Sequence, residues 1–357
     1  MSSASLESAL TFPLSEQIPS SGSTLEVAPG ILWVRMGLPF ALDHINLWLV
    51  RDALEGPEGL RQGWTAIDCG IHNDSTHRDW EQVFATALQG LPVLRVLVTH
   101  MHPDHMGSAD WMCTKWKAPL WMSSTEYQSA QMATHGLSNF GGDLTHSFFV
   151  QHGWSEPDAM HDVKARLNYY SGMVPQVPNR YHRLMGGHTF KMGGAAWRCI
   201  AGYGHSPEHM ALYCADQHIL ISGDMVLPKI STNVSVYAQE PEGNALQQFL
   251  DSLDAFQDLP EETLVLPSHG RPFKGLHTRI GQLQDHHKER LAEVIGACKE
   301  KPQSAHDTLP LLFKRALNFH QTTFAMGEAV AHLHLLWHKG QLKRTLDLDG
   351  VYRFAAL

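Results

Sequence analysis

Cysteines are scarce in this sequence, and no two of them form a CxxC pair. The chain of 357 residues has five at widely separated positions: Cys69, Cys113, Cys199, Cys214 and Cys298. Disulfide frameworks and zinc ribbons need cysteines in regular pairs, so an odd and scattered set argues against both. A reducing, cytoplasmic setting is expected.

Targeting and membrane signals are also missing. The first 30 residues contain neither Lys nor Arg and no apolar core, which argues against a signal peptide. No stretch is long and apolar enough to cross a bilayer, so no membrane partner is expected. The net charge of -9 and the pI of about 6.2 disfavour nucleic acid as the main partner. Length and a hydrophobic content of 43% allow one large domain and a smaller one.

Histidine, by contrast, is abundant, and one group of histidines follows an apolar strand. The strand 93–98 leads into the run His100-Met101-His102-Pro103-Asp104-His105. Alternation along an extended chain places His100 and His102 on one side, so both can bind one ion. The proline turns the chain and lets Asp104 and His105 face a second ion. A His-rich loop without metal is the alternative in a chain with 24 histidines, but order and spacing favour metal.

This His-x-His-x-Asp-His run resembles the signature of the metallo-β-lactamase-fold hydrolases, which include glyoxalase II (hydroxyacylglutathione hydrolase), lactonases and several nucleases. The resemblance implies an α/β fold of the αββα sandwich type. It covers residues from about 24 to 273, apart from an insertion at about 135–187. We expect a catalytic domain at 1–276 and a C-terminal domain at 277–357.

The patterning along the chain fits such a sandwich. Residues 1–23 are Ser-rich and predict a loose arm or a strap over the surface. The insertion shows no regular succession of strand patterns, so we expect it to form a helical lid. Helices are expected at 78–88, 106–116 and 124–134, and strands at 24–27, 31–36, 45–50, 64–67, 93–98, 119–122, 188–192, 195–201, 210–214, 219–222 and 263–266.

Two later histidines and one early aspartate fall at places where the family has functional residues. Asp68 stands in an Asp-Cys-Gly run that is typical of a turn, but the resemblance implies that its carboxylate supports the metal loop from behind. The resemblance implies that His205, which follows a glycine at a strand end, is the third ligand of the first metal. His209 is the alternative, and a buttressing role is the preferred interpretation for it.

The remaining landmarks complete a two-metal site. The resemblance implies that Asp224, in a Gly-Asp pair, bridges the two cations and that His269, in a Pro-Ser-His-Gly run, binds the second. One ion is then held by His100, His102 and His205, and the other by Asp104, His105 and His269, with Asp224 between them. Nitrogen and oxygen ligands suit zinc, the expected metal, with iron and manganese as alternatives.

The implied chemistry is hydrolysis of a small thioester or related ester by a hydroxide that bridges two divalent metal ions. Asp104 would bind metal and orient the nucleophile. Tyr203, Lys229, Asn233 and Arg271 lie near the metal loops and are candidates for holding an anionic substrate, with a structural role as the alternative. A lactonase, a metal-dependent endoribonuclease and, more distantly, a non-enzymatic binding module stay open as other functions.

The C-terminal region differs from the rest of the chain in its predicted order of helices and strands. Helices are expected at 276–297, 308–317 and 326–339, followed by a hairpin at 340–354. This order resembles the winged-helix domain appended to some members of the fold. From His277 onward it has 11 Lys and Arg against 8 Asp and Glu, an excess too small to predict a DNA-reading surface. We expect it to wall one side of the active site or to mediate homodimerisation.

Overall fold

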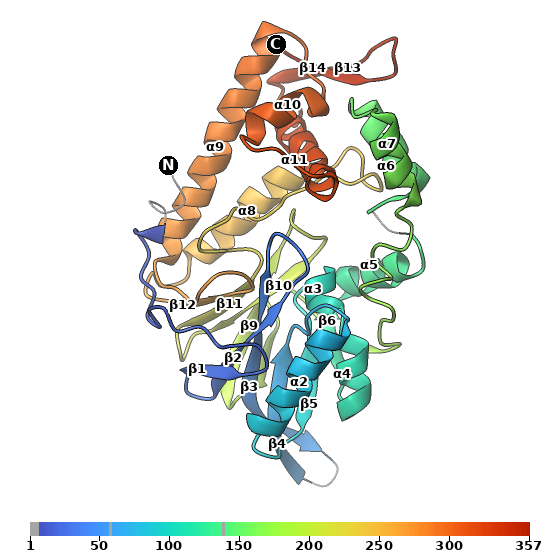
Figure 1. The fold of residues 1–357 in the computed structure, drawn as a ribbon. Coiled ribbons are helices and arrows are strands. Elements are labelled where there is room, and N and C mark those ends of the chain that lie inside the picture. The colour runs from blue at the N-terminus through green and yellow to red at the C-terminus, as the bar shows by residue number, and fades with distance from the viewer. Residues whose placement is uncertain (1–6, 57–58, 138–139) are drawn as a thin grey trace.

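Two β-sheets lie face to face in the computed structural model, which describes residues 7–56, 59–137 and 140–357 (Figure 1). The first sheet has seven strands in sequence order, antiparallel from β1 to β4 and parallel from β4 to β7. They are β1 (Thr24–Ala28), β2 (Ile31–Gly37), β3 (His44–Gly56), β4 (Gly59–Ile67), β5 (Val93–Leu97), β6 (Leu120–Ser123) and β7 (Tyr181–Leu184).

The second sheet has five strands in the order β12-β11-β10-β9-β8. Its bounds are β8 (Thr189–Met192), β9 (Ala195–Gly202), β10 (His209–Cys214), β11 (Ile219–Gly223) and β12 (Leu264–Pro267). Only the β11–β12 pair in this sheet is parallel among the described strands. Because β9, β11 and β12 run in a common direction, their carboxyl ends meet at one edge.

A buried layer of apolar side chains joins the two sheets. Trp33 and Trp48 from the first sheet pack in one buried cluster with Trp197 and Leu212 from the second. Successive side chains of a strand point to opposite faces, so the other residues of the same strands face outward. Both outer faces therefore need a cover of helices.

Helices cover the two outer faces and make the αββα sandwich. The first sheet packs against α2 (Asp74–Thr86), α4 (Ala109–Trp116) and α5 (Ser124–Thr134), with α3 (Pro103–Met106) as one short turn before α4. The second sheet packs against α8 (Ala245–Gln257), α9 (Leu276–Glu300) and α11 (Phe319–His338). The predicted α/β sandwich is confirmed, although α8 was not among the predicted helices.

The insertion contains helices, as expected, but it also returns a strand to the first sheet. Its helices are α6 (Gly142–Gln151) and α7 (Pro157–Ala165), which lie beside the C-terminal helices in Figure 1. The prediction that strands are absent until residue 188 was wrong, because β7 pairs in parallel with β6. This strand has four residues, Tyr-His-Arg-Leu, and lies at a sheet edge, so its apolar signal is weak.

Three helices and a hairpin form the C-terminal region, in the predicted order. The middle helix, α10 (Ala305–Leu312), begins and ends earlier than expected, and α11 begins seven residues earlier. Both starts are fixed by capping boxes, in which Ser304 and Asn318 accept hydrogen bonds from the first helical turn. The hairpin is β13 (Leu342–Leu346) with β14 (Tyr352–Ala356).

The N-terminal arm is a strap in its described part. Thr11 and Lys274 exchange two backbone hydrogen bonds, of 3.1 and 2.8 Å, and Leu10 is buried beside them. All five cysteines are buried and unpaired. Across the described ranges, no helix combines the length and the hydropathy that a bilayer crossing requires.

Candidate metal centre

Seven His and Asp side chains converge at the edge where strands of both sheets end. Two follow β5, two stand in α3, and one each follows β9, β11 and β12. β5, β11 and β12 are buried almost throughout, so the polar residues that follow them lie at the rim of the core. In chain order these residues are His100, His102, Asp104, His105, His205, Asp224 and His269.

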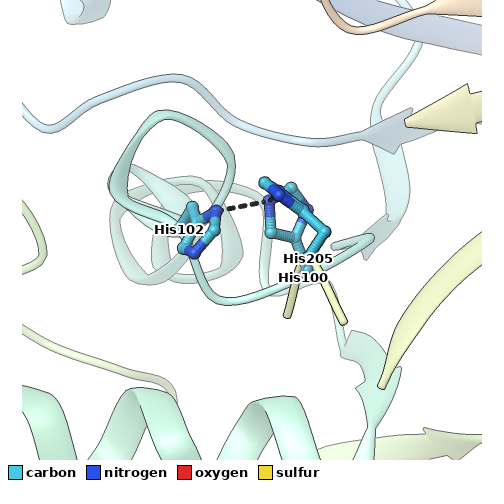
Figure 2. Close-up of side chains that lie close together, drawn as sticks. All are labelled: His100, His102 and His205. Atoms are coloured by element: carbon cyan, nitrogen blue, oxygen red, sulfur yellow. Dashed lines mark hydrogen bonds between the residues drawn. The ribbon is translucent and has the colours of Figure 1, made fainter. Parts of the chain in front are cut away.

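The first group consists of three histidines (Figure 2). His100 Nε2 lies 2.9 Å from His102 Nδ1 and 3.2 Å from His205 Nε2. One ring nitrogen carries at most one proton, so His100 Nε2 cannot donate to both neighbours. Nitrogens bound tetrahedrally at about 2.1 Å from one zinc ion lie roughly 3.4 Å apart, close to the observed spacing. The three nitrogens fit one metal ion.

The second group combines one carboxylate with two histidines. Asp104 Oδ2 lies 3.7 Å from His105 Nε2 and 3.5 Å from His269 Nε2. These separations also suit ligands of a single cation. The buried His105 Nε2 has no hydrogen-bond partner among the described residues, and a buried polar atom left in this way is costly unless a ligand satisfies it.

Asp224 stands between the two groups and turns a different oxygen to each. Its Oδ2 lies 3.4 Å from His205 Nε2, and its Oδ1 lies 3.5 Å from the Nε2 atoms of both His105 and His269. The buried Oδ1 accepts no hydrogen bond from any described residue. This arrangement fits a carboxylate shared by two cations.

Hydrogen bonds behind three of the histidines aim their Nε2 lone pairs at the site. The Nδ1 atoms of His205 and His269 lie 2.8 Å from the backbone carbonyl oxygens of Asn233 and His44. His105 Nδ1 lies 2.8 Å from Asp68 Oδ2. An acceptor at Nδ1 fixes the proton there and leaves Nε2 free to bind metal.

Asp68 lies behind the metal loop, where it was expected. Besides His105, its carboxylate accepts hydrogen bonds from the Thr99 amide and hydroxyl, at 2.8 and 2.9 Å. Its backbone φ of 59° is left-handed, a conformation that Asp tolerates better than most residues. Asp68 thereby fixes the end of β5 and the ring of His105 together.

His209 supports the backbone of the site and belongs to none of the three candidate ligand groups. Its buried Nε2 accepts a hydrogen bond of 3.2 Å from the Asp224 amide. Gly223, with φ at 54°, gives this ring room, since a Cβ there would lie 2.1 Å from His209 Nε2. The preferred interpretation of His209, a buttress, agrees with this placement.

Burial and neighbouring charges shift the pKa values of histidines in the two groups in opposite directions. Burial, together with the neighbouring rings, holds the pKa of His100 and His102 well below the usual histidine value, so both rings are neutral and can offer a lone pair to a cation. Burial also disfavours a charged His105, but Asp68, Asp104 and Asp224 outweigh it and raise the pKa to about 10. Three carboxylates around one imidazole form a site that attracts a cation.

Sequence reasoning missed Glu126, a buried residue at the start of α5. Its Oε2 accepts from the Met101 amide at 2.8 Å, and its Oε1 accepts from the Ser206 hydroxyl at 2.7 Å and the Glu208 amide at 2.6 Å. One carboxylate thus ties the loop of the first two ligands to the loop of His205. The sequence signal was a Ser-x-x-Glu helix start, which predicts a cap and not this role.

A cavity of about 350 Å³ opens onto the ligand cluster. Of the four candidate substrate contacts, Asn233 lines it and the other three do not. Lys229 Nζ lies 3.7 Å from Glu7, and Arg271 binds Glu16 at 2.6 Å. Tyr203 is 42% exposed. Lys229 and Arg271 pair with acidic residues of the N-terminal strap, which fits the structural alternative for both, and a substrate contact by any of the three stays a prediction.

The fold and the ligand cluster together define a metal-dependent hydrolase scaffold. Residues 45–269 match the family described as "Metallo-beta-lactamase superfamily", and residues 291–357 match "Metallo-beta-lactamase-like, C-terminal domain". The chain belongs to the metallo-beta-lactamase superfamily and is a metallo-hydrolase of that superfamily. The winged-helix likeness of the C-terminal region stays a prediction.

Three relatives cover nearly the whole chain. A beta-lactamase domain protein from Burkholderia ambifaria is 49% identical with a TM-score of 0.93, covering 99% of this chain and 100% of its own. The metallo-beta-lactamase family protein TTHA1429 from Thermus thermophilus is 25% identical with a TM-score of 0.74. The match covers 93% of this chain and 100% of that protein. The probable metallo-hydrolase YqjP of Bacillus subtilis is 23% identical over 311 residues, which are 86% of this chain and 92% of the relative.

Proposed function

We propose that this protein hydrolyses a small thioester or related ester with two divalent metal ions, zinc being the expected metal. The observation that carries the proposal is the position of Asp224. Its two oxygens face two separate ligand groups at 3.4 and 3.5 Å. A single ion would need only one of these groups, whereas the chain supplies both in full.

Two relatives that match over part of their length support the thioester. The hydroxyacylglutathione hydrolase of Hyphomonas neptunium is 24% identical over 147 residues, which are 41% of this chain and 54% of that protein. The atrochrysone carboxyl ACP thioesterase AacuM of Aspergillus aculeatus is 26% identical over 175 residues, which are 46% of this chain and 52% of that protein. By name, each of these two proteins cleaves an acyl group from a thiol.

The residues of the chain would divide the work as follows. Two bound cations would supply a water of lowered pKa and a Lewis acid for the substrate carbonyl. Asp104, whose side chain lines the cavity, would accept a hydrogen bond from the attacking water and orient it toward the acyl carbon. A carbon–oxygen bond forms, the carbon–sulfur bond breaks, and a proton from the water passes to the departing thiolate.

The test joins metal analysis to a substrate panel. Protein purified without chelator is analysed for metals and assayed on S-lactoylglutathione, an acyl-CoA, an acyl-lactone and a short RNA. We expect about two metals per chain and thioester turnover. Asp224→Ala should lose at least one metal and nearly all turnover, whereas Asp216→Ala, an exposed turn residue, should change neither.

Other outcomes would redirect the proposal. One metal per chain in the wild type would overturn the two-metal site. Two metals with cleavage of the lactone or the RNA alone would keep the site and transfer the function to a lactonase or a nuclease.

A further inference from the structure

Four parts of the chain wall the cavity above the ligand cluster, and one of them is the insertion, through Phe140, Tyr169 and Met173. The β2–β3 loop contributes Leu38 and Phe40, the loop after Asp224 contributes Ile230, and the C-terminal region contributes Phe313 and Phe324. Most of this wall is apolar, as in sites that bury the hydrocarbon part of a ligand.

Alternate residues of the segment between α10 and α11 face this cavity. Phe313, Arg315 and Leu317 line it, whereas Lys314 between them is exposed and does not. Phe313 has the extended backbone angles φ -120° and ψ 105°, which suit such alternation. The segment thus presents to the cavity, at alternate positions, an apolar, a cationic and a second apolar side chain.

Arg315 is the one Lys or Arg among the described residues that line the cavity. Its side chain is exposed and has no hydrogen bond or ion pair within the described ranges. The carboxylate of Glu328, which also lines the cavity, is engaged instead by Asn233 Nδ2 at 3.1 Å. Arg315 differs in this respect from Lys229 and Arg271, which have acidic partners outside the cavity.

We propose that Arg315 binds a carboxylate or phosphate group of the substrate at the cavity rim, while the flanking apolar side chains hold its hydrocarbon part. A guanidinium presents a fork of donors that matches either anion. This inference rests on the proposed function and narrows it to thioesters that carry negative charge. The metal ligands at the cavity floor and Arg315 at its rim would hold two ends of one molecule.

The experiment compares three thioesters with one shared acyl group. Acyl-N-acetylcysteamine is neutral, acyl-glutathione carries carboxylates, and acyl-CoA carries phosphates. Arg315→Gln should raise KM for one or both anionic substrates by about 10- to 100-fold, the worth of a charge-assisted hydrogen bond, with kcat within about two-fold. Turnover of the neutral substrate should not change, Arg315→Lys should restore part of the loss, and the neighbouring Lys314→Gln should have no effect.

A binding measurement separates this inference from the proposed function. S-hexylglutathione, a thioether that cannot be hydrolysed, is titrated calorimetrically into the metal-loaded wild type and Arg315→Gln. Weaker binding to the variant supports the role of Arg315 even if no thioester is turned over. Equal losses on neutral and anionic substrates, or no loss on any together with unchanged S-hexylglutathione binding, would overturn it.

Discussion

The side-chain amide of Asn46 donates a hydrogen bond of 2.8 Å to the carbonyl of Pro267, 221 residues further along the chain. The same amide donates to the Gly270 carbonyl at 2.9 Å, and the Asn46 backbone amide donates to Ser268 at 2.7 Å. A buried residue of β3 in the first sheet therefore holds, by hydrogen bonds, both sides of the loop that follows β12 of the second sheet and carries His269.

Asn46→Ala should weaken the second metal group selectively. The substitution leaves two carbonyls without their donor and frees the His269 loop, and loss of such supporting contacts typically costs on the order of 10- to 100-fold in metal affinity. Titration against a coloured chelator should show one metal bound about as tightly as in the wild type and one bound more weakly. Asn168→Ala, at an exposed position, is the matched control. Two unchanged metals in Asn46→Ala would contradict the prediction.

Glu126→Gln should loosen the first metal group. The carboxylate accepts three hydrogen bonds, and an amide in its place turns a donor toward at least one of the same donors. We expect metal affinity about 10- to 100-fold lower and a free energy of unfolding about 1–3 kcal/mol smaller. Chelator competition and urea unfolding measure the two effects.

The control for that variant is Glu81→Gln, where an exposed carboxylate pairs with Lys115 at 2.7 Å. It should change the free energy of unfolding by less than about 1 kcal/mol and leave metal affinity alone. If Glu126→Gln behaves like this control, the carboxylate does not position the ligand loops.

Four of the seven candidate ligands could be proposed from the local His-x-His-x-Asp-His run, and the resemblance to a known family supplied the other three, His205, Asp224 and His269. Their supports could not be proposed, because Glu126 and Asn46 meet partners about 80 and 221 residues away. Neither residue belongs to a motif that names its target. The same reason explains why the sequence did not reveal the ion pairs of Lys229 and Arg271, whose acidic partners Glu7 and Glu16 lie in the N-terminal strap.

For the fold, apolar periodicity located most of the strands of the two sheets, and it failed where that signal is weak. β7 is short and lies at an edge, and the strand predicted at 45–50 stops before the charged residues Arg51 and Asp52, through which β3 continues to Gly56. Helix starts were displaced at Ser304 and Asn318 because capping side chains, not apolar spacing, set them.

A buried ion pair joins the first sheet to the β8–β9 turn. Arg95 Nη2 lies 2.7 Å from Asp52 Oδ2, and the Gly193 amide donates to Asp52 Oδ1 at 3.0 Å. Both charged side chains are at most 2% exposed. Asp52→Ala would leave Arg95 charged and unpaired, so we expect the free energy of unfolding to fall by about 3–5 kcal/mol.

Urea unfolding tests this value, and Glu81→Gln again provides an exposed ion pair for comparison. The double variant Asp52→Ala/Arg95→Met removes both charges and should recover part of the lost stability, because no uncompensated charge is then buried. A loss for Asp52→Ala as small as that of the exposed pair would show that the contact contributes little.

Glu328 gives the folded protein a pH dependence that a single substitution should remove. Burial raises the pKa of its carboxyl to about 7, against an ordinary value of 4.5, although the hydrogen bond from Asn233 favours the charged form. The folded state therefore binds this proton more tightly than the unfolded state. Above pH 7 the buried carboxylate destabilises the fold, and this penalty should disappear as the pH falls from about 7 to 4.5.

Glu328→Gln keeps the shape of the side chain and an oxygen that can accept from Asn233. At matched metal content, the variant should be more stable than the wild type at about pH 8 and nearly equal to it at about pH 4.5, as measured by urea unfolding across that range. Glu300→Gln, at an exposed helix end, should show no such trend. A stability difference between Glu328→Gln and the wild type that stays constant with pH would mean that Glu328 does not titrate in this range. Glu328 would then be a permanent carboxylate in the wall of the cavity.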